Sequence, residues 1–252
     1  GKKTKGDEVV LEDIPLDDDK AFDLLAEGRT MGVFQLSSDG MTKYLMQLEP
    51  TRIEDIMAMV ALYRPGPIEF IPEYIDRKHN PEKIDYPHPS LEEILDKSLG
   101  LLIYQDDIML TAIKLAGYSW LEADKFRKAM GKKIPELMDE QEKKFKRGCI
   151  ENGIDEETTN DLWARIKPFA AYGFNKSHAA SYGMVAYQTA YMKANYPAEY
   201  MSALMTAESS DLDKIADAVE ECERMEINVL PPDINESLSN FTYMDDNNIR
   251  FG

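Results

Sequence analysis

The sequence has few cysteines and no long apolar run. Only two cysteines, Cys149 and Cys222, occur in 252 residues, and their separation matches no metal-ligand spacing. Two isolated thiols fit a reducing cytoplasm better than a disulfide framework. The apolar run Met57–Leu62 is far too short to span a bilayer, and the polar start GKKTKGDEVV is unlike a signal peptide. These absences predict a cytoplasmic protein with no membrane partner.

Basic residues are scarce relative to acidic ones. The 29 lysines and arginines are outnumbered by 47 aspartates and glutamates, which gives a net charge of −18. This balance argues against a uniformly basic surface for nucleic acid. It permits a local basic cleft, because charges more than about 10 Å away are largely screened.

The sequence also lacks the patterns of several catalytic sites. It has no glycine-rich phosphate loop, no nucleophile elbow and no zinc-ligand spacing. Its neighbouring carboxylates, at 17–19, 106–107, 211–213 and 245–246, lie at predicted helix starts or in a predicted turn, where capping explains them. We therefore predict a chain that carries no metal-ion chemistry of its own and has no metal site.

Helical periodicity dominates what is present. Predicted helices cover 21–28, 40–49, 51–63, 91–98, 106–118, 119–130, 135–153, 155–170, 177–196, 197–209 and 211–225, with a loop and a short helix in 68–90. A strand at 227–234 and a hairpin formed by 241–244 and 249–251 follow. The predicted fold class is mainly α, a multi-helix domain with a small β element near the C-terminus.

Polar residues, prolines and glycines mark the ends of these helices. Ser38, Thr51 and Ser90 are placed to cap helices, Ser119 begins another, and Gly131 is expected to end that one.

The domain prediction follows from the change of character along the chain. We predict a linker at 1–20, a helical domain at 21–225 and the truncated start of a β segment at 226–252. The hairpin at this end is expected to have little of its own to pack on.

The most informative stretch is YGFNKSHAASY, from Tyr172 to Tyr182. Asn175, Lys176, Ser177 and His178 occur at or just inside a predicted helix start, where unpaired N–H groups and the helix dipole favour an anion. The aromatic rings beside them offer flat faces for a base, and His178 and Tyr182 share a helix face. The alternative is a simple cap, by Ser177 or Asn175, with His178 in a partly buried slot. A cap explains one residue of the four.

A purely basic cluster lies about forty residues earlier. Five cations occur between 125 and 133 with no acidic residue, namely Lys125, Arg127, Lys128, Lys132 and Lys133. Arginine offers a bidentate fork for phosphate oxygens and lysine a mobile point charge. If Gly131 ends the helix, Lys132 and Lys133 approach from the following turn. The alternative is that these cations only complement the dipole at a helix C-terminus.

Arg64 begins the rigid turn RPGP at 64–67. The two prolines restrict where its side chain points. A phosphate-binding and a structural arginine are equally consistent with this pattern.

These residues together resemble a known family. The segments VFQLSSDGM (33–41), ALYRPGP (61–67), YIDRKH (74–79), LLIYQDD (101–107), FRKAMGKK (126–133), YGFNKSHAASYGMVAYQTAYMKANYPAEYM (172–201) and VLPPDIN (229–235) resemble the C-family of bacterial replicative DNA polymerases, the DNA polymerase III alpha subunits. The resemblance runs from about Ile14 to the last residue and is closer to the DnaE type than to the PolC type. It places the chain in the fingers domain.

The resemblance implies a function in DNA-templated deoxynucleotidyl transfer. Fingers of this family bind the incoming dNTP and the primer–template, while a palm absent from this chain carries the catalytic aspartates and their Mg²⁺. It therefore implies a fragment that is inactive alone and binds no cofactor itself. The implied partners are the palm and thumb of the same polymerase, with a sliding clamp and a proofreading exonuclease contacting mostly other regions.

The resemblance also assigns residues. Arg127 and Lys128 match positions that reach the triphosphate, and Asn175, Lys176 and Ser177 match positions that line the nucleotide site. His178 matches the position placed against the sugar, and Tyr172 one placed near the nascent base pair.

Three residues depart from the family pattern. Lys128 replaces an arginine, which weakens bidentate phosphate contact, while Asp107 replaces a glutamine and Ser38 a glutamate. A different class of function stays open, a helical protein-interaction module whose basic cluster is structural.

Overall fold

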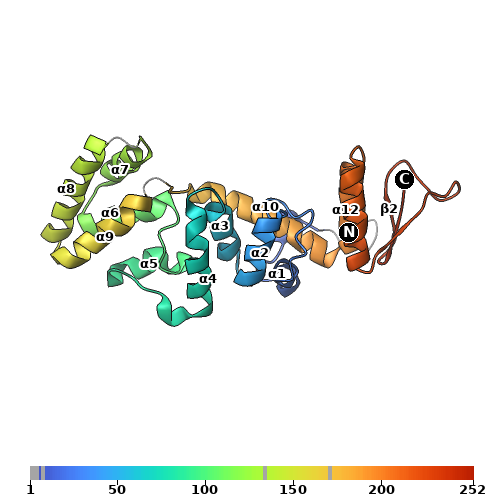
Figure 1. The fold of residues 1–252 in the computed structure, drawn as a ribbon, viewed down its shortest axis with the longest axis horizontal. Coiled ribbons are helices and arrows are strands. Elements are labelled where there is room, and N and C mark those ends of the chain that lie inside the picture. Colours follow the sequence, from blue (N-terminus) through green and yellow to red (C-terminus); the bar gives the residue numbers. More distant parts are fainter. Residues whose placement is uncertain (1–5, 7–8, 133–134, 170–171) are drawn as a thin grey trace. The chain divides into compact units, whose positions relative to one another are not determined.

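The computed structural model describes residues 6, 9–132, 135–169 and 172–252 (Figure 1). Over these residues the chain forms twelve α-helices and one three-stranded sheet near the C-terminus, which confirms the predicted fold class. None of the described helices is long and apolar enough to cross a membrane. The chain divides into two compact units, 1–56 with 183–252 and 57–182. The predicted domain boundaries stay predictions.

The first unit contains helices from both ends of the chain and the sheet. Its elements are α1 (Asp19–Ala26), α2 (Asp39–Leu48), α11 (Pro197–Ala207), α12 (Leu212–Arg224), β1 (Asn228–Leu230), β2 (Thr242–Asp245) and β3 (Asn248–Arg250). α3 (Ile53–Leu62) and α10 (Lys176–Asn195) contribute residues to both units. Asp18, Ser38 and Asp211 cap α1, α2 and α12 by accepting N–H groups of the first turn.

The small sheet packs on α11 and α12. β1 pairs with β3 in parallel and β2 pairs with β3 antiparallel, so the strand order is β1-β3-β2. Phe241 and Ile249 are buried in one cluster with Met201, Met205 and Cys222 of the two helices. The expectation that the hairpin has little to pack on is therefore wrong, because the helices supply the apolar face that a hairpin needs.

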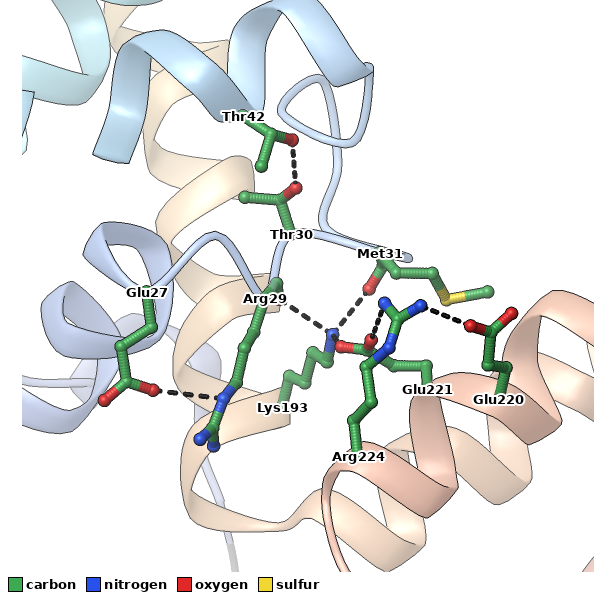
Figure 2. A network of polar contacts seen from close by, with 9 residues as sticks. All are labelled: Glu27, Arg29, Thr30, Met31, Thr42, Lys193, Glu220, Glu221 and Arg224. Atoms are coloured by element: carbon green, nitrogen blue, oxygen red, sulfur yellow. Dashed lines mark hydrogen bonds and ion pairs between the residues drawn. The ribbon is translucent and has the colours of Figure 1, made fainter. Parts of the chain in front are cut away.

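A buried ion pair ties together three segments of the first unit (Figure 2). Lys193 of α10 is fully buried, and its Nζ donates to the carbonyls of Arg29 and Met31, both at 2.8 Å, and to Glu221 Oε1 of α12 at 2.6 Å. Three acceptors thus satisfy the three donors of the ammonium group. Burial lowers the pKa of Lys193, while its hydrogen bond to Glu221 opposes that shift.

The second unit is a helical body with an aromatic core. Its remaining helices are α4 (Ile71–His79), α5 (Glu92–Leu95), α6 (Gln105–Ala116), α7 (Trp120–Lys132), α8 (Pro135–Glu151) and α9 (Glu156–Phe169). The rings of Phe126 and Trp163 stack with centroids 5.9 Å apart, and Phe145 lies 5.7 Å from Trp163. These rings come from α7, α8 and α9, so the core holds α7, which carries the basic cluster, against the other two helices.

Two predicted helix ends are wrong. Gly131 lies inside α7, which continues to Lys132, and a glycine inside a helix costs only about 0.5–1 kcal/mol relative to alanine, too little to end the helix by itself. Ser90 does not cap a helix. Instead His88 Nδ1 accepts the Ser90 N–H at 3.2 Å and opens a short 3₁₀ turn, Pro89–Leu91, before α5.

Candidate functional site

The start of α10 presents the predicted anion-binding residues. Asn175 is the cap, because its Oδ1 accepts the His178 N–H at 2.9 Å. Ser177 is therefore not the cap, and both Ser177 and His178 are exposed. Lys176 is half-buried at the first helical position. The cap accounts for Asn175 and leaves the other polar side chains free of that role.

His178 lies between two aromatic rings. Its ring centroid is 4.0 Å from that of Tyr182 and 5.4 Å from that of Phe174, both tilted. The contact with Tyr182, one helical turn further on, confirms that the two residues share a face. Because His178 is exposed while its ring packs against Phe174 and Tyr182, this part of the helix can meet a flat or sugar-like ligand from solvent.

Arg64 holds the segment that precedes α10. Its Nη2 donates to the Tyr172 carbonyl at 2.7 Å and its Nε to the Ala61 carbonyl at 2.8 Å. Its guanidinium carbon lies 4.5 Å from the centre of the Phe174 ring. Burial lowers the pKa of Arg64. These contacts match the structural alternative for Arg64, which positions the 172–174 backbone.

The ring of Tyr172 lies directly over Gly66. A Cβ built on Gly66 would be 2.4 Å from Tyr172 Cε1, and Gly66 has a φ of +99° that other residues rarely adopt. The turn at 64–67 therefore positions Tyr172 both through the backbone contact with Arg64 and through the flat surface at Gly66.

Two carboxylates that the sequence did not mark as part of the site face the start of α10. The Lys176 N–H donates to Asp106 Oδ2 at 3.4 Å, and Lys176 Nζ lies 3.9 Å from Asp107 Oδ1. Asp107 Oδ2 accepts the N–H groups of Ile103 and Tyr104, at 3.1 and 2.8 Å. A carboxylate of the protein itself thus accepts an N–H group at this helix start.

The carboxyl group of Asp107 is buried, and its pKa is shifted far from the ordinary value. It is almost fully buried, and its Oδ1 accepts no hydrogen bond from the described part of the chain. Burial raises the pKa of Asp107 to about 6, against the opposing effects of the Tyr104 N–H and the Lys176 charge. No local pattern points to this contact, because residues 107 and 176 meet only through the pairing of Tyr104 with Phe174 in a short parallel bridge.

The basic cluster lies on α7 and centres on one carboxylate. Asp124 Oδ1 accepts from Arg127 Nη2 at 2.7 Å, and Asp124 Oδ2 lies 2.6 Å from Lys128 Nζ. The hydrogen bonds with Lys128 and Arg127 lower the pKa of Asp124. Lys132 is exposed at the last residue of the helix. Lys133 lies outside the described residues.

The predicted site residues therefore form two groups. Arg127 and Lys128 gather around Asp124, whereas Arg64, Tyr172 and 175–182 gather at the start of α10. Within the described residues, no ion pair of Arg127, Lys128 or Lys176 connects the Asp124 group with the group at the start of α10. Both lie in the second unit, 57–182. Among described residues, no three His, Cys, Asp or Glu side chains are close enough together to hold a metal ion.

Comparison with known proteins places these residues in context. Residues 1–153 match the model of the bacterial DNA polymerase III alpha subunit finger domain. The DNA polymerase III subunit alpha of Thermus aquaticus is 50% identical over 241 residues, covering 94% of this chain and 20% of the relative. Those of Chlamydia pneumoniae and Escherichia coli K12 are each 46% identical, over 250 and 246 residues, covering 99% and 95% of this chain and 20% and 21% of the relatives. The chain spans about a fifth of the length of these relatives.

Proposed function

The chain belongs to the bacterial DNA polymerase III alpha subunit family, through its finger domain, and from this premise we propose that it binds the incoming dNTP and the primer–template. The observation that carries the proposal is the exposed start of α10, where Asn175, Lys176, Ser177 and His178 are presented together. Polymerases of this family transfer a deoxynucleotide to the end of a primer, and such a site would act in that reaction.

The triphosphate is held by the cations of α7 and of α10. Asp124 keeps Arg127 and Lys128 side by side, at 2.7 and 2.6 Å, so the two donors are already oriented before a ligand arrives. Lys132 extends the cluster by one turn, and Lys133 is proposed to join it. Such preorganised cations neutralise the charge that develops on a leaving pyrophosphate.

The sugar and base meet the aromatic side of the start of α10. His178, supported by Phe174 and Tyr182, presents a ring to the sugar, and Tyr172 presents its ring near the base. Asn175 keeps the helix start in place as its cap, and Lys176 and Ser177 add a cation and a hydroxyl donor. Arg64 acts on the ligand only through the backbone that it positions.

The metal-dependent part of the reaction lies elsewhere in the polymerase. We assign the Mg²⁺ and the catalytic aspartates to the palm and expect the isolated chain to be inactive. The proposed partners are dNTP, primer–template DNA, and the palm and thumb of the same polymerase chain. We propose that the sliding clamp and the proofreading exonuclease contact mainly other regions of the polymerase. We propose the cytoplasm as the location of the protein.

Binding measurements on the chain test the proposal. We expect a labelled dNTP to bind at low ionic strength, where phosphate contacts are strongest, and binding to fall when Arg127, Lys176 and His178 are all replaced by alanine. Replacing Lys143, an exposed lysine of α8, is the control. In an intact alpha subunit, Arg127→Ala is expected to raise the KM for dNTP, lower kcat, or both. Unchanged kinetics would remove Arg127 from this role.

One observation favours a second candidate function. Arg127 and Lys128 are already paired with Asp124, as a structural cluster would be. On that reading the chain is a helical protein-interaction module with an acidic surface. If the chain with all its native residues binds neither dNTP nor primer–template at low ionic strength, this second candidate is preferred.

A further inference from the structure

The outer face of α7 carries an exposed tryptophan among lysines. At 100° per residue, one side of the helix presents the residues that we call the outer face of α7, namely Trp120, Leu121, Asp124, Lys125, Lys128, Gly131 and Lys132. The opposite side buries Ala123, Phe126, Ala129 and Met130 in the core. Trp120 and Leu121 are each 65% exposed, although large apolar side chains are usually covered.

The charge of this face is opposite to that of the whole chain. Three cations of this face, Lys125, Lys128 and Lys132, accompany a single carboxylate, Asp124, which is already paired with Lys128 and with Arg127 at the edge of the face. Glu122, the nearest other acid, is paired with Lys144 of α8 at 2.6 Å. On a protein with a net charge of −18, this is a positive surface set beside an exposed indole. Its charge complements a polyanion.

The spacing of these groups suits a single nucleic-acid strand. Lys125 lies five residues beyond Trp120, about 8 Å along the helix axis, so one strand can place a base on the indole and a phosphate at Lys125. Trp120 and Leu121 lie at the start of the same face, where a base can stack on the indole and a sugar can rest on the aliphatic chain. A duplex would offer only the phosphates, because its bases are already stacked.

We propose that the outer face of α7 binds the single-stranded part of the template, with Trp120 stacking on an unpaired base and Lys125 contacting the strand's phosphates. This inference rests on the proposed function. It gives a role in DNA binding to Trp120 and Lys125, two residues that are not part of the proposed triphosphate site. The start of the face serves the template and its end, at Lys128 and Lys132, serves the incoming nucleotide.

The two tryptophans of the chain make the test direct. Trp120 is 65% exposed and Trp163 is 3% exposed, so a ligand in solution reaches only the former. Adding a short oligothymidylate to the 252-residue chain is expected to quench Trp120 emission, while the buried emission of Trp163 reports that the domain is folded. The variant Trp120→Phe should lose the quenching, and Trp120→Ala should weaken binding between about 5-fold and 150-fold.

Charge variants separate phosphate contact from general electrostatics. Lys125→Glu is expected to weaken binding and to reduce the slope of log affinity against log salt by about one or more, because a phosphate contact is lost. Lys143→Glu makes the same change of charge on α8 and should alter affinity much less. Equal effects of the two variants would overturn the assignment of Lys125.

The remaining outcomes each decide the inference. If labelled dNTP binds but oligothymidylate does not quench Trp120, the template face is wrong and the proposed function stands. If neither ligand binds, both fail. If duplex DNA quenches Trp120 as strongly as the single strand, stacking is wrong. If acrylamide quenches Trp120 in this chain but not in an intact alpha subunit, the face packs on another part of the polymerase and the inference is overturned.

Discussion

At the scale of single residues, the site depends on side chains whose partners lie far away in the sequence. Asp107 is buried against Lys176, and Arg64 holds the Tyr172 carbonyl. Both residues occur in segments that resemble the family, yet their contacts were not predicted. Their effects on stability are measurable apart from any ligand.

The buried carboxylate of Asp107 is expected to make stability depend on pH. Its pKa is raised to about 6 in the folded chain, above the ordinary value near 3.8, so the folded state binds the proton more tightly than the unfolded state. Its contribution to stability is therefore present below about pH 4 and is lost as the pH rises through about 6. Denaturant unfolding across this range should show the loss, and Asp107→Asn should remove it.

Glu122 provides the control with the opposite sign. Its hydrogen bonds with Lys144 and Ser119 lower the pKa of Glu122 to about 2. Its contribution is therefore present above about pH 4.5 and is lost as the pH falls toward 2. The same pH dependence in Glu122→Gln and Asp107→Asn would contradict the assignment.

Arg64→Lys is expected to destabilise the chain although the charge is kept. A lysine has no planar fork with which to donate to both the Ala61 and Tyr172 carbonyls while also lying over the Phe174 ring. We expect a loss of roughly 1–3 kcal/mol in the free energy of unfolding, measured with urea. Arg147→Lys, on the exposed surface of α8, should change it by less than about 0.5 kcal/mol. A small effect at Arg64 would mean that its contacts are dispensable.

At the scale of elements, α8 is positioned by how closely it approaches α6. Gly148 of α8 lies against the end of α6, where a Cβ would be 2.2 Å from the Ala116 carbonyl oxygen. Gly131 of α7 has nothing within 4 Å of such a Cβ. The two glycines are both helical, so they differ mainly in packing.

The two glycines therefore form a matched pair for substitution. Gly148→Ala should push α8 away from α6 and destabilise by roughly 1–3 kcal/mol, the range for an overpacked site. Gly131→Ala should stabilise by up to about 1 kcal/mol, because alanine favours the helix. Thermal unfolding of both variants measures the difference. Equal shifts in Tm would show that α8 can move away from α6 without cost.

At the scale of the whole molecule, the first unit is made from both ends of the chain. Lys193 satisfies its ammonium group with the carbonyls at 29 and 31 and with Glu221, so it joins segments more than 160 residues apart (Figure 2). Arg224 lies at the edge of the same network, with its guanidinium near both Glu220 and Glu221.

Lys193→Met is expected to destabilise the chain by about 3–5 kcal/mol, because it leaves the Glu221 carboxylate buried without its main partner. The double variant Lys193→Met with Glu221→Leu should lose less than the two single variants together. Arg224→Met, whose side chain is largely exposed, should cost less than about 1 kcal/mol. Chemical denaturation measures the free energy of unfolding of the three single variants and of the double variant. Additive losses in the double variant would show that the pair is not coupled.

Local sequence determined the helices and most of their caps. Asp18, Ser38 and Asp211 accept N–H groups in their own first turns, and Gly153 follows α8 with a φ of +84°. These signals act over three or four residues, so they are readable without a fold. The segments from 33 to 235 also determined the family, which the comparisons confirm. Asn175, Lys176, Ser177 and His178 were named as a candidate site from the same kind of local pattern, and their role in binding a ligand stays a prediction.

Tertiary structure decided which side chains meet. The contact of Asp107 with Lys176, the burial of Lys193, the strand order β1-β3-β2 and the outward direction of Trp120 all depend on packing between segments distant in the chain. The sequence periodicity indicates which side of a helix is apolar. Which distant segment packs against that side depends on the free energy gained when both apolar surfaces are buried together.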